Sequence, residues 1–129
     1  MAARGRGVPA ARLSRTAEQV AQLRRDAASV FERHDVVLMP AAAALPWPAE
    51  LAYPEVIAGR PAGPRGHAVY TGWVNAAGLP GLALPCEPSS AGLPIGLQLI
   101  GAHGADDELL DLGAAYEPAC PWAGRWPDL

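Results

Sequence analysis

Apolar residues alternate with small or polar residues over two segments in the second half of the chain. Such alternation is typical of strands with one buried face. The run Glu87–Gly92 lies between the segments and is rich in turn-forming residues, so the pattern predicts a β-hairpin whose apolar face contacts a core. The alternating residues are Leu82, Leu84 and Cys86, followed by Ile95, Leu97 and Leu99.

Three other segments repeat apolar residues at helical spacing. The first helix is predicted from a capping box at Thr16 and Gln19 to about Arg33. The second covers residues 67 to 77 and stops at Gly78-Leu79-Pro80, where glycine can adopt a left-handed cap and proline prevents continuation. The third begins at Asp106. The expected buried residues are Val20, Leu23, Ala27, Val30 and Phe31 in the first helix, Val69, Trp73 and Ala77 in the second, and Leu109, Leu112, Ala115 and Tyr116 in the third.

Between Pro40 and Pro64 the chain contains six prolines and an alanine run. Because proline cannot donate a backbone hydrogen bond, neither a helix nor a ladder is expected to extend far here. The segment is predicted to be a long ordered loop, a feature that is usually functional or marks contact with further protein. Downstream, Trp122 and Trp126 are expected to fold back as apolar anchors.

Size and charge limit the possible functions. A chain of 129 residues has the length of a single domain. Residues 1–15 are expected to be a flexible segment, and residues 16–129 are expected to be folded. The net charge of −3 and the lack of a basic cluster argue against nucleic acid and anionic membranes as partners.

No apolar run is long enough to span a bilayer, and no secretory signal is visible, so a cytoplasmic location is predicted. Cys86 and Cys120 are expected to be reduced thiols.

Two stretches of the sequence resemble the C-terminal region of the amidase signature family. They read NAAGLPGLALPC, from Asn75 to Cys86, and GLPIGLQLIG, from Gly92 to Gly101. The likeness extends upstream to Asp35–Pro40 and covers about residues 17–122. It implies an α/β fold, namely the C-terminal slice of the family's α/β/α sandwich with a mixed sheet, in the order helix, strand, long loop, helix, hairpin, helix.

The same resemblance implies a hydrolase that cleaves carboxamide C–N bonds through two serines and a lysine base. That Ser-Ser-Lys segment is not in this sequence, which has no lysine at all. Because a hydroxyl nucleophile needs a nearby base, no catalytic residue is assigned and the chain is expected to be inactive alone. The expected partner is a chain that carries the amidase N-terminal catalytic part, or a second copy of this one. The alternative is a non-catalytic remnant or interaction module.

In amidase signature enzymes the segment that corresponds to residues 40–64 borders the substrate funnel. Trp47 and Tyr53 are therefore the candidates for substrate contact. The alternative is that both aromatic side chains only cover the core. Members that draw ammonia from glutamine carry an acidic residue just before the helix that matches Tyr70 and Thr71, whereas this chain has His67-Ala68-Val69. A general carboxamide hydrolase is thus favoured over the glutamine-dependent subclass.

Three further groups of polar residues resemble catalytic or metal-binding sites, but their positions in predicted turns and at helix ends explain them better. Ser89-Ser90 lies in the predicted hairpin turn without a lysine. His34, His67 and His103 are too far apart for zinc-ligand spacing. The acids from Asp106 to Asp111 lack the spacing of a calcium loop, and negative charge at a helix N-terminus is stabilising in itself. No metal site and no cofactor are predicted.

Overall fold

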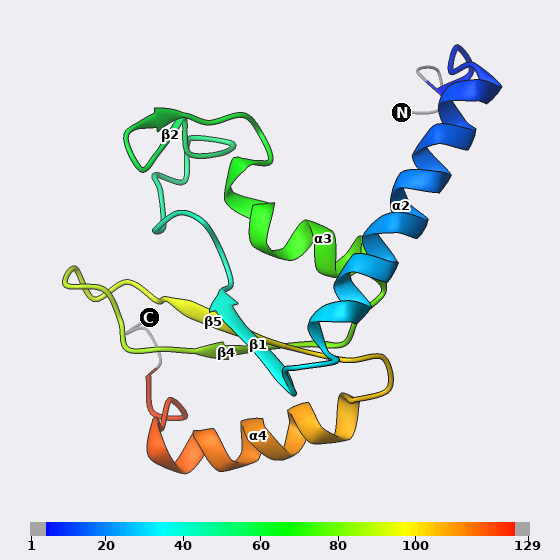
Figure 1. The fold of residues 1–129 in the computed structure, drawn as a ribbon. Helices are drawn as coiled ribbons and strands as arrows, with labels where there is room; N and C mark the ends of the chain where they lie inside the picture. Colours follow the sequence, from blue (N-terminus) through cyan, green and yellow to red (C-terminus); the bar gives the residue numbers. More distant parts are fainter. Residues whose placement is uncertain (1–4, 126–129) are drawn as a thin grey trace.

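A computed structural model describes residues 5–125 of the chain (Figure 1). It contains three α-helices, a short 3-10 turn and five strands among these residues. In chain order the elements are α2 (Ala10–Val30), β1 (Val36–Pro40), β2 (Val56–Ile57), β3 (Arg60–Pro61), the 3-10 turn η1 (Gly66–Ala68), α3 (Val69–Ala77), β4 (Gly81–Pro85), β5 (Gly96–Gly101) and α4 (Asp106–Ala119). The order of helix, strand, loop, helix, hairpin and helix is as predicted.

The larger sheet has the order β1-β5-β4, with β5 in the centre. The predicted hairpin is confirmed, since Leu82 pairs with Leu99 and Leu84 pairs with Leu97. On the other side of β5, Leu38 pairs with Leu99. Within residues 5–125 all pairings are antiparallel, because β5 runs antiparallel to both of its neighbours and β2 runs antiparallel to β3. The mixed sheet is predicted for the whole sandwich, of which these strands are a part.

Helices cover both faces of this sheet, which gives three layers (Figure 1). The helices α2 and α3 lie on one face, where Ile100 is fully buried. Helix α4 lies on the other face, where Leu109 packs against Leu84 and Leu99. Alternate residues of β5 therefore enter different cores, as the two-residue period of a strand requires. This arrangement confirms the α/β class and the α/β/α slice. The first core contains Ala27, Val74, Ala77, Leu79 and Ile100.

Helix α3 ends where the sequence predicts. Gly78 has φ 75°, and its N–H donates to the Val74 carbonyl at 2.9 Å. The predicted buried face is only partly right, because Val69 is 56% exposed while Val74 is buried. Val69 lies in the first turn of α3, and Val74 with Ala77 meets the core that contains Ile100.

Helix α4 shows a similar shift of its buried face. Leu109 is buried as predicted, but Leu112 is 43% exposed. Gly113 takes the contact position instead, since a Cβ there would lie 2.7 Å from Leu82 Cδ2. The helix thus approaches the sheet through a glycine, which a search for apolar residues cannot reveal. The acids of its first turn are where the sequence predicts them.

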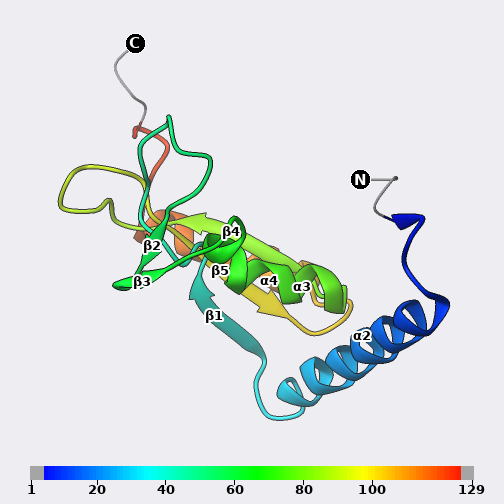
Figure 2. The same ribbon diagram turned by 90° about the horizontal axis from the view of Figure 1, so that it is seen from above.

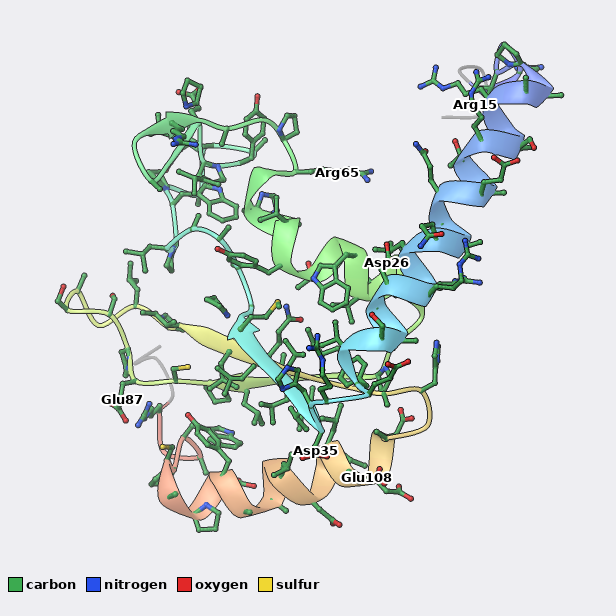
Figure 3. The ribbon with its side chains drawn as sticks, in the orientation of Figure 1. Arg15, Asp26, Asp35, Arg65, Glu87 and Glu108 are labelled. Atoms are coloured by element: carbon green, nitrogen blue, oxygen red, sulfur yellow. The ribbon has the colours of Figure 1, made fainter. Side chains whose placement is uncertain are left out.

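Helix α2 begins at Ala10, after Pro9, rather than at Thr16. The predicted capping box is wrong, because the Thr16 hydroxyl lies inside the helix and donates to the Arg12 carbonyl at 2.9 Å. The predicted division after residue 15 therefore falls within a helix, and the flexibility of residues 1–15 stays a prediction. In Figures 1 and 2 the N-terminal half of α2 extends away from the other elements, and Figure 3 shows Arg15 at this projecting end.

The proline-rich segment is an irregular loop with one small hairpin. Strands β2 and β3 each have two residues. Ala58 and Gly59 connect them with φ values of 49° and 75°, a turn geometry that suits a two-residue hairpin. Further along the chain, Trp122 folds back and stacks on Tyr116 with ring centroids 6.0 Å apart, as predicted, whereas Trp126 lies outside the described residues.

Candidate functional site

A hollow of about 430 Å³ opens at the end of the larger sheet where β1 finishes and β5 starts. We call it the β1-end pocket. These two ends lie side by side because the strands are antiparallel, and the first turn of α3 supplies a third wall through Tyr70. The pocket is lined by Pro40, Ala41, Ala42, Ala43, Ala44, Leu45, Pro46, Trp47, Tyr70, Pro94, Ile95 and Gly96.

Backbone hydrogen bonds hold the alanine wall of the pocket in place. The Ala41 N–H donates to the Gly96 carbonyl at 2.9 Å, which continues the β1–β5 ladder beyond the strand. The Ala43 N–H donates to the His67 carbonyl at 2.9 Å, which ties the segment to the 3-10 turn before α3. The wall is thus anchored to two regular elements although it has no regular structure itself.

Trp47 forms the aromatic part of the wall. Its indole N–H donates to the Leu51 carbonyl at 3.0 Å, and its ring lies 5.0 Å from the ring of His67 at an angle of 47°. Behind it, His67 Nδ1 is buried without a hydrogen-bond partner in the described part of the chain. Of the two predicted contact residues, Trp47 lines the pocket, whereas Tyr53 is half-buried and is not among the lining residues.

Tyr70, Pro94 and Ile95 line the pocket but were not predicted as site residues. The signal that could have found them is the strand pairing, because the residues just before β5 must lie next to those just after β1. Ser89, by contrast, has the turn role that the sequence favours. Its Oγ accepts a hydrogen bond from the Leu93 N–H at 3.2 Å.

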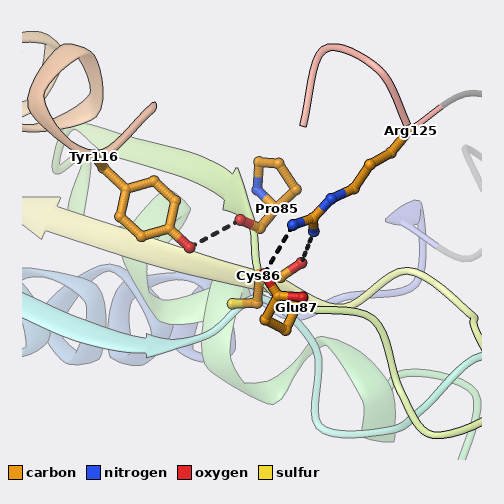
Figure 4. A network of polar contacts seen from close by, with 5 residues as sticks. All are labelled: Pro85, Cys86, Glu87, Tyr116 and Arg125. Carbon is orange, nitrogen blue, oxygen red and sulfur yellow. Dashed lines mark hydrogen bonds and ion pairs between the residues drawn. The ribbon is translucent and has the colours of Figure 1, made fainter. Parts of the chain in front are cut away.

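A second hollow, of about 520 Å³, lies on the other side of Pro94 and Ile95. It is bordered by Cys86, Trp122 and Arg125. Arg125 donates to the Cys86 carbonyl at 3.1 Å and to Glu87 Oε1 at 2.8 Å (Figure 4). This ion pair holds the residues after α4 against the hairpin loop and neutralises the charge of Arg125.

Tyr116 sits beside this second hollow and donates its hydroxyl hydrogen bond to the Pro85 carbonyl at 3.0 Å (Figure 4). The hydrogen bond with the Cys120 side chain, desolvation, and the nearby acidic groups Cys120, Cys86 and Glu87 raise the pKa of Tyr116 to about 12. Both cysteines are free thiols, as predicted. The hydrogen bond from Tyr116 to Pro85 thus links α4 to the end of β4.

The β1-end pocket has no serine, cysteine, histidine, lysine or acid among its lining residues. Within residues 5–125 no three His, Cys, Asp or Glu side chains come close enough together to hold a metal ion. The same part of the chain has no helix that is both long and apolar enough to cross a bilayer. The side chains that line the β1-end pocket supply no nucleophile with a base.

The family model described as Amidase matches residues 2–110 of the chain. Among curated proteins, a glutamyl-tRNA(Gln) amidotransferase subunit of Roseiflexus sp. (strain RS-1) is 40% identical over 114 residues, which are 88% of this chain and 22% of that protein. The protein of the same name from Cyanothece sp. (strain PCC 7425 / ATCC 29141) is 55% identical over 56 residues, 43% of this chain and 12% of that protein. The chain thus spans about a fifth or less of the length of these relatives.

Solved structures resemble most of this chain, among them the following two. A bacterial aryl acylamidase of the amidase signature enzymes superposes with a TM-score of 0.83 and 26% identity, over 93% of this chain and 25% of that one. The 6-aminohexanoate cyclic dimer hydrolase, solved with its substrate, gives a TM-score of 0.82 and 27% identity, over 97% of this chain and 28% of that one.

Proposed function

The chain belongs to the amidase signature family, and from this premise we propose that it forms the C-terminal, substrate-contacting part of a hydrolase that cleaves carboxamide C–N bonds. The observation that carries the proposal is the β1-end pocket, an open hollow whose walls come from β1, β5 and α3. In this proposal the pocket holds the substrate, with Trp47 and Tyr70 as its aromatic side chains. Tyr53, which lies off the pocket, contributes to the loop that supports it.

The reaction itself needs residues that this chain does not have. Activation of a serine hydroxyl requires a base, and the family's base is a lysine, which is absent from all 129 residues. We therefore place the Ser-Ser-Lys segment outside these residues, on the same polypeptide or on another. The 129 residues alone are expected to bind an amide without hydrolysing it.

The catalytic part has a surface on which to dock. The projecting half of α2 carries Leu13, which is 67% exposed, and strand β1 is an edge of the sheet with Leu38 65% exposed. Unpaired strand edges and exposed apolar side chains favour association with another chain or segment. We propose that both surfaces contact the catalytic part in a cytoplasmic enzyme, and that they lead to self-association in its absence.

The proposal is tested by reconstitution. The 129 residues are expressed alone and together with the N-terminal portion of an amidase signature enzyme that contains the Ser-Ser-Lys segment, and ammonia release from simple carboxamides is measured. Hydrolysis is expected only from the pair. A control pair whose lysine is changed to alanine should be inactive. Hydrolysis by the 129 residues alone would contradict the proposal.

A second candidate is a component of a glutamine-using amidotransferase, favoured by the 40% identity over 88% of the chain to a protein of that name. Against it stands His67-Ala68-Val69 in place of the acidic residue expected before α3. A third candidate is a non-catalytic interaction module. Preferential ammonia release from glutamine by the reconstituted pair would favour the second, and stable association without hydrolysis of any amide would favour the third.

A further inference from the structure

We propose that the β1-end pocket selects carboxamides whose acyl group is uncharged and apolar, and rejects those that carry a charge near the amide. This inference rests on the proposed function and specifies its substrate class. It starts from the chemistry of the walls. The lining side chains are those of alanine, proline, leucine and isoleucine with two aromatic rings, and the lining residues include no acid, arginine or histidine.

A charged ligand group would find no opposite charge among the lining side chains of this pocket. An ionised group that is moved away from water without an opposite charge or hydrogen bonds is strongly disfavoured. The imidazole of His67 packs against the ring of Trp47, but His67 is not itself a lining residue. Glutamine, with an ammonium and a carboxylate, would find no counter-charge in these walls.

An apolar group, in contrast, meets a wall that is already formed. Trp47 is fixed by its hydrogen bond to the Leu51 carbonyl and by the His67 ring, and the Ala43 N–H is bonded to the His67 carbonyl. Little ordering of these residues is needed on binding, which favours affinity. A volume of about 430 Å³ lies within the ordinary range of small-molecule pockets.

The side chains that line the pocket offer few polar groups to a ligand. The Trp47 indole N–H is already used by Leu51, so the hydroxyl of Tyr70 is the side-chain group of the lining that can still bond a ligand atom. One hydroxyl suits a single neutral polar atom, such as the amide oxygen or nitrogen. The remainder of the ligand must be apolar to gain from the walls.

The test measures binding by the 129-residue chain with saturation-transfer NMR, which observes the ligand and therefore works with a self-associated protein. The ligands are butanamide, pentanamide and hexanamide, compared with glutamine and succinamic acid. Affinity should rise about fourfold for each added methylene, while glutamine and succinamic acid should show no saturation transfer.

A matched pair of variants locates the binding. Ala44→Asp places a carboxylate in the wall, and Ala44→Asn places a neutral side chain of the same size there. The aspartate variant should bind hexanamide at least about tenfold more weakly than the asparagine variant, and should bind the cationic 6-aminohexanamide more tightly. Equal weakening by both variants would show that size rather than charge governs the site and would overturn the inference.

Three binding results would overturn the inference. They are glutamine binding as tight as hexanamide binding, an affinity that is independent of chain length, and absence of hexanamide binding.

Two other outcomes distinguish this inference from the proposed function. If the reconstituted pair hydrolyses amides but prefers charged ones, the function stands and the inference fails. If apolar amides bind with the predicted length dependence and the pair hydrolyses nothing, the inference stands and the proposed function fails.

Discussion

Replacing Ile100 with alanine tests the core that organises the fold. Ile100 is fully buried in the central strand, between Val37 of β1 and Gly81 of β4. The substitution removes three carbons, each with a transfer free energy of about 0.8 kcal/mol, and leaves a cavity under α3. The free energy of unfolding should fall by about 2–5 kcal/mol. For a domain with a total of about 5–15 kcal/mol, this loss is large.

Leu38→Ala is the matched control, because Leu38 lies on the neighbouring strand and is 65% exposed. Its effect should stay within about 0.5 kcal/mol. Both variants are unfolded in urea and followed by far-UV circular dichroism at several protein concentrations, since association adds apparent stability to the folded state. Equal losses for the two variants at low concentration would refute the assignment of the core.

Three further outcomes are expected. Gly78→Val should lower the free energy of unfolding by about 1–2 kcal/mol, because valine must adopt the positive φ of the α3 cap. Pro80→Ala should have a smaller effect on the thermal unfolding temperature. Equal effects of the two variants would refute the assignment of Gly78 as the cap of α3. The raised pKa of Tyr116 means that the folded state keeps the phenol proton, so its contribution to stability is complete below about pH 10 and is lost as the pH rises toward 12. Tyr116→Phe should remove this component of an alkaline unfolding titration, and an unchanged profile would contradict it. Leu13→Glu should reduce sedimentation as a dimer or larger species and reduce binding of a hydrophobic dye, whereas Leu110→Glu on α4, 60% exposed, should change neither as much; a chain that is monomeric and dye-silent without either change would refute the association.

Local sequence signals predicted the elements that depend on local interactions. The hairpin of β4 and β5 was correctly predicted because alternation and turn residues determine its register without reference to the rest of the chain. The end of α3 was correct for the same reason, since a glycine with positive φ followed by proline is a local stop. The start of α2 was wrong because the sequence from Ala10 to Arg15 is compatible with a helix, and a proline before its first turn can begin one.

Buried faces were predicted less well than elements. Leu112 has the spacing of a core residue, yet Gly113 faces the sheet. The rotation of α4 is fixed by how closely the helix approaches Leu82, and only a glycine allows that distance. The spacing of apolar residues shows which side chains of a helix can be buried. Which of them are buried depends on the sheet that packs against the helix. Val69 of α3 shows the same effect.

The candidate site was predicted only through one of its residues. Trp47 and Tyr53 looked equivalent in sequence, as two aromatic residues among prolines. The structure separates them because Trp47 bonds to Leu51 and packs on His67 at the end of the sheet, while Tyr53 precedes the small hairpin of β2 and β3. No local pattern contains this difference, since it depends on the pairing of Ala41 with Gly96, far apart in the chain.

The exposed N-terminal half of α2 likewise depends on which element packs against it. Leu13, Val20 and Ala27 recur along one helix at intervals that favour a single face. Ala27 is buried against α3, whereas Leu13 is 67% exposed. Helix α3 has nine residues and α2 has 21, so α3 is too short to cover the whole face. In the enzyme proposed above, a further element would cover the outer turns of α2. The docking surface and the incomplete chemistry of the pocket therefore support one proposal, in which a catalytic part contacts α2 and supplies the base.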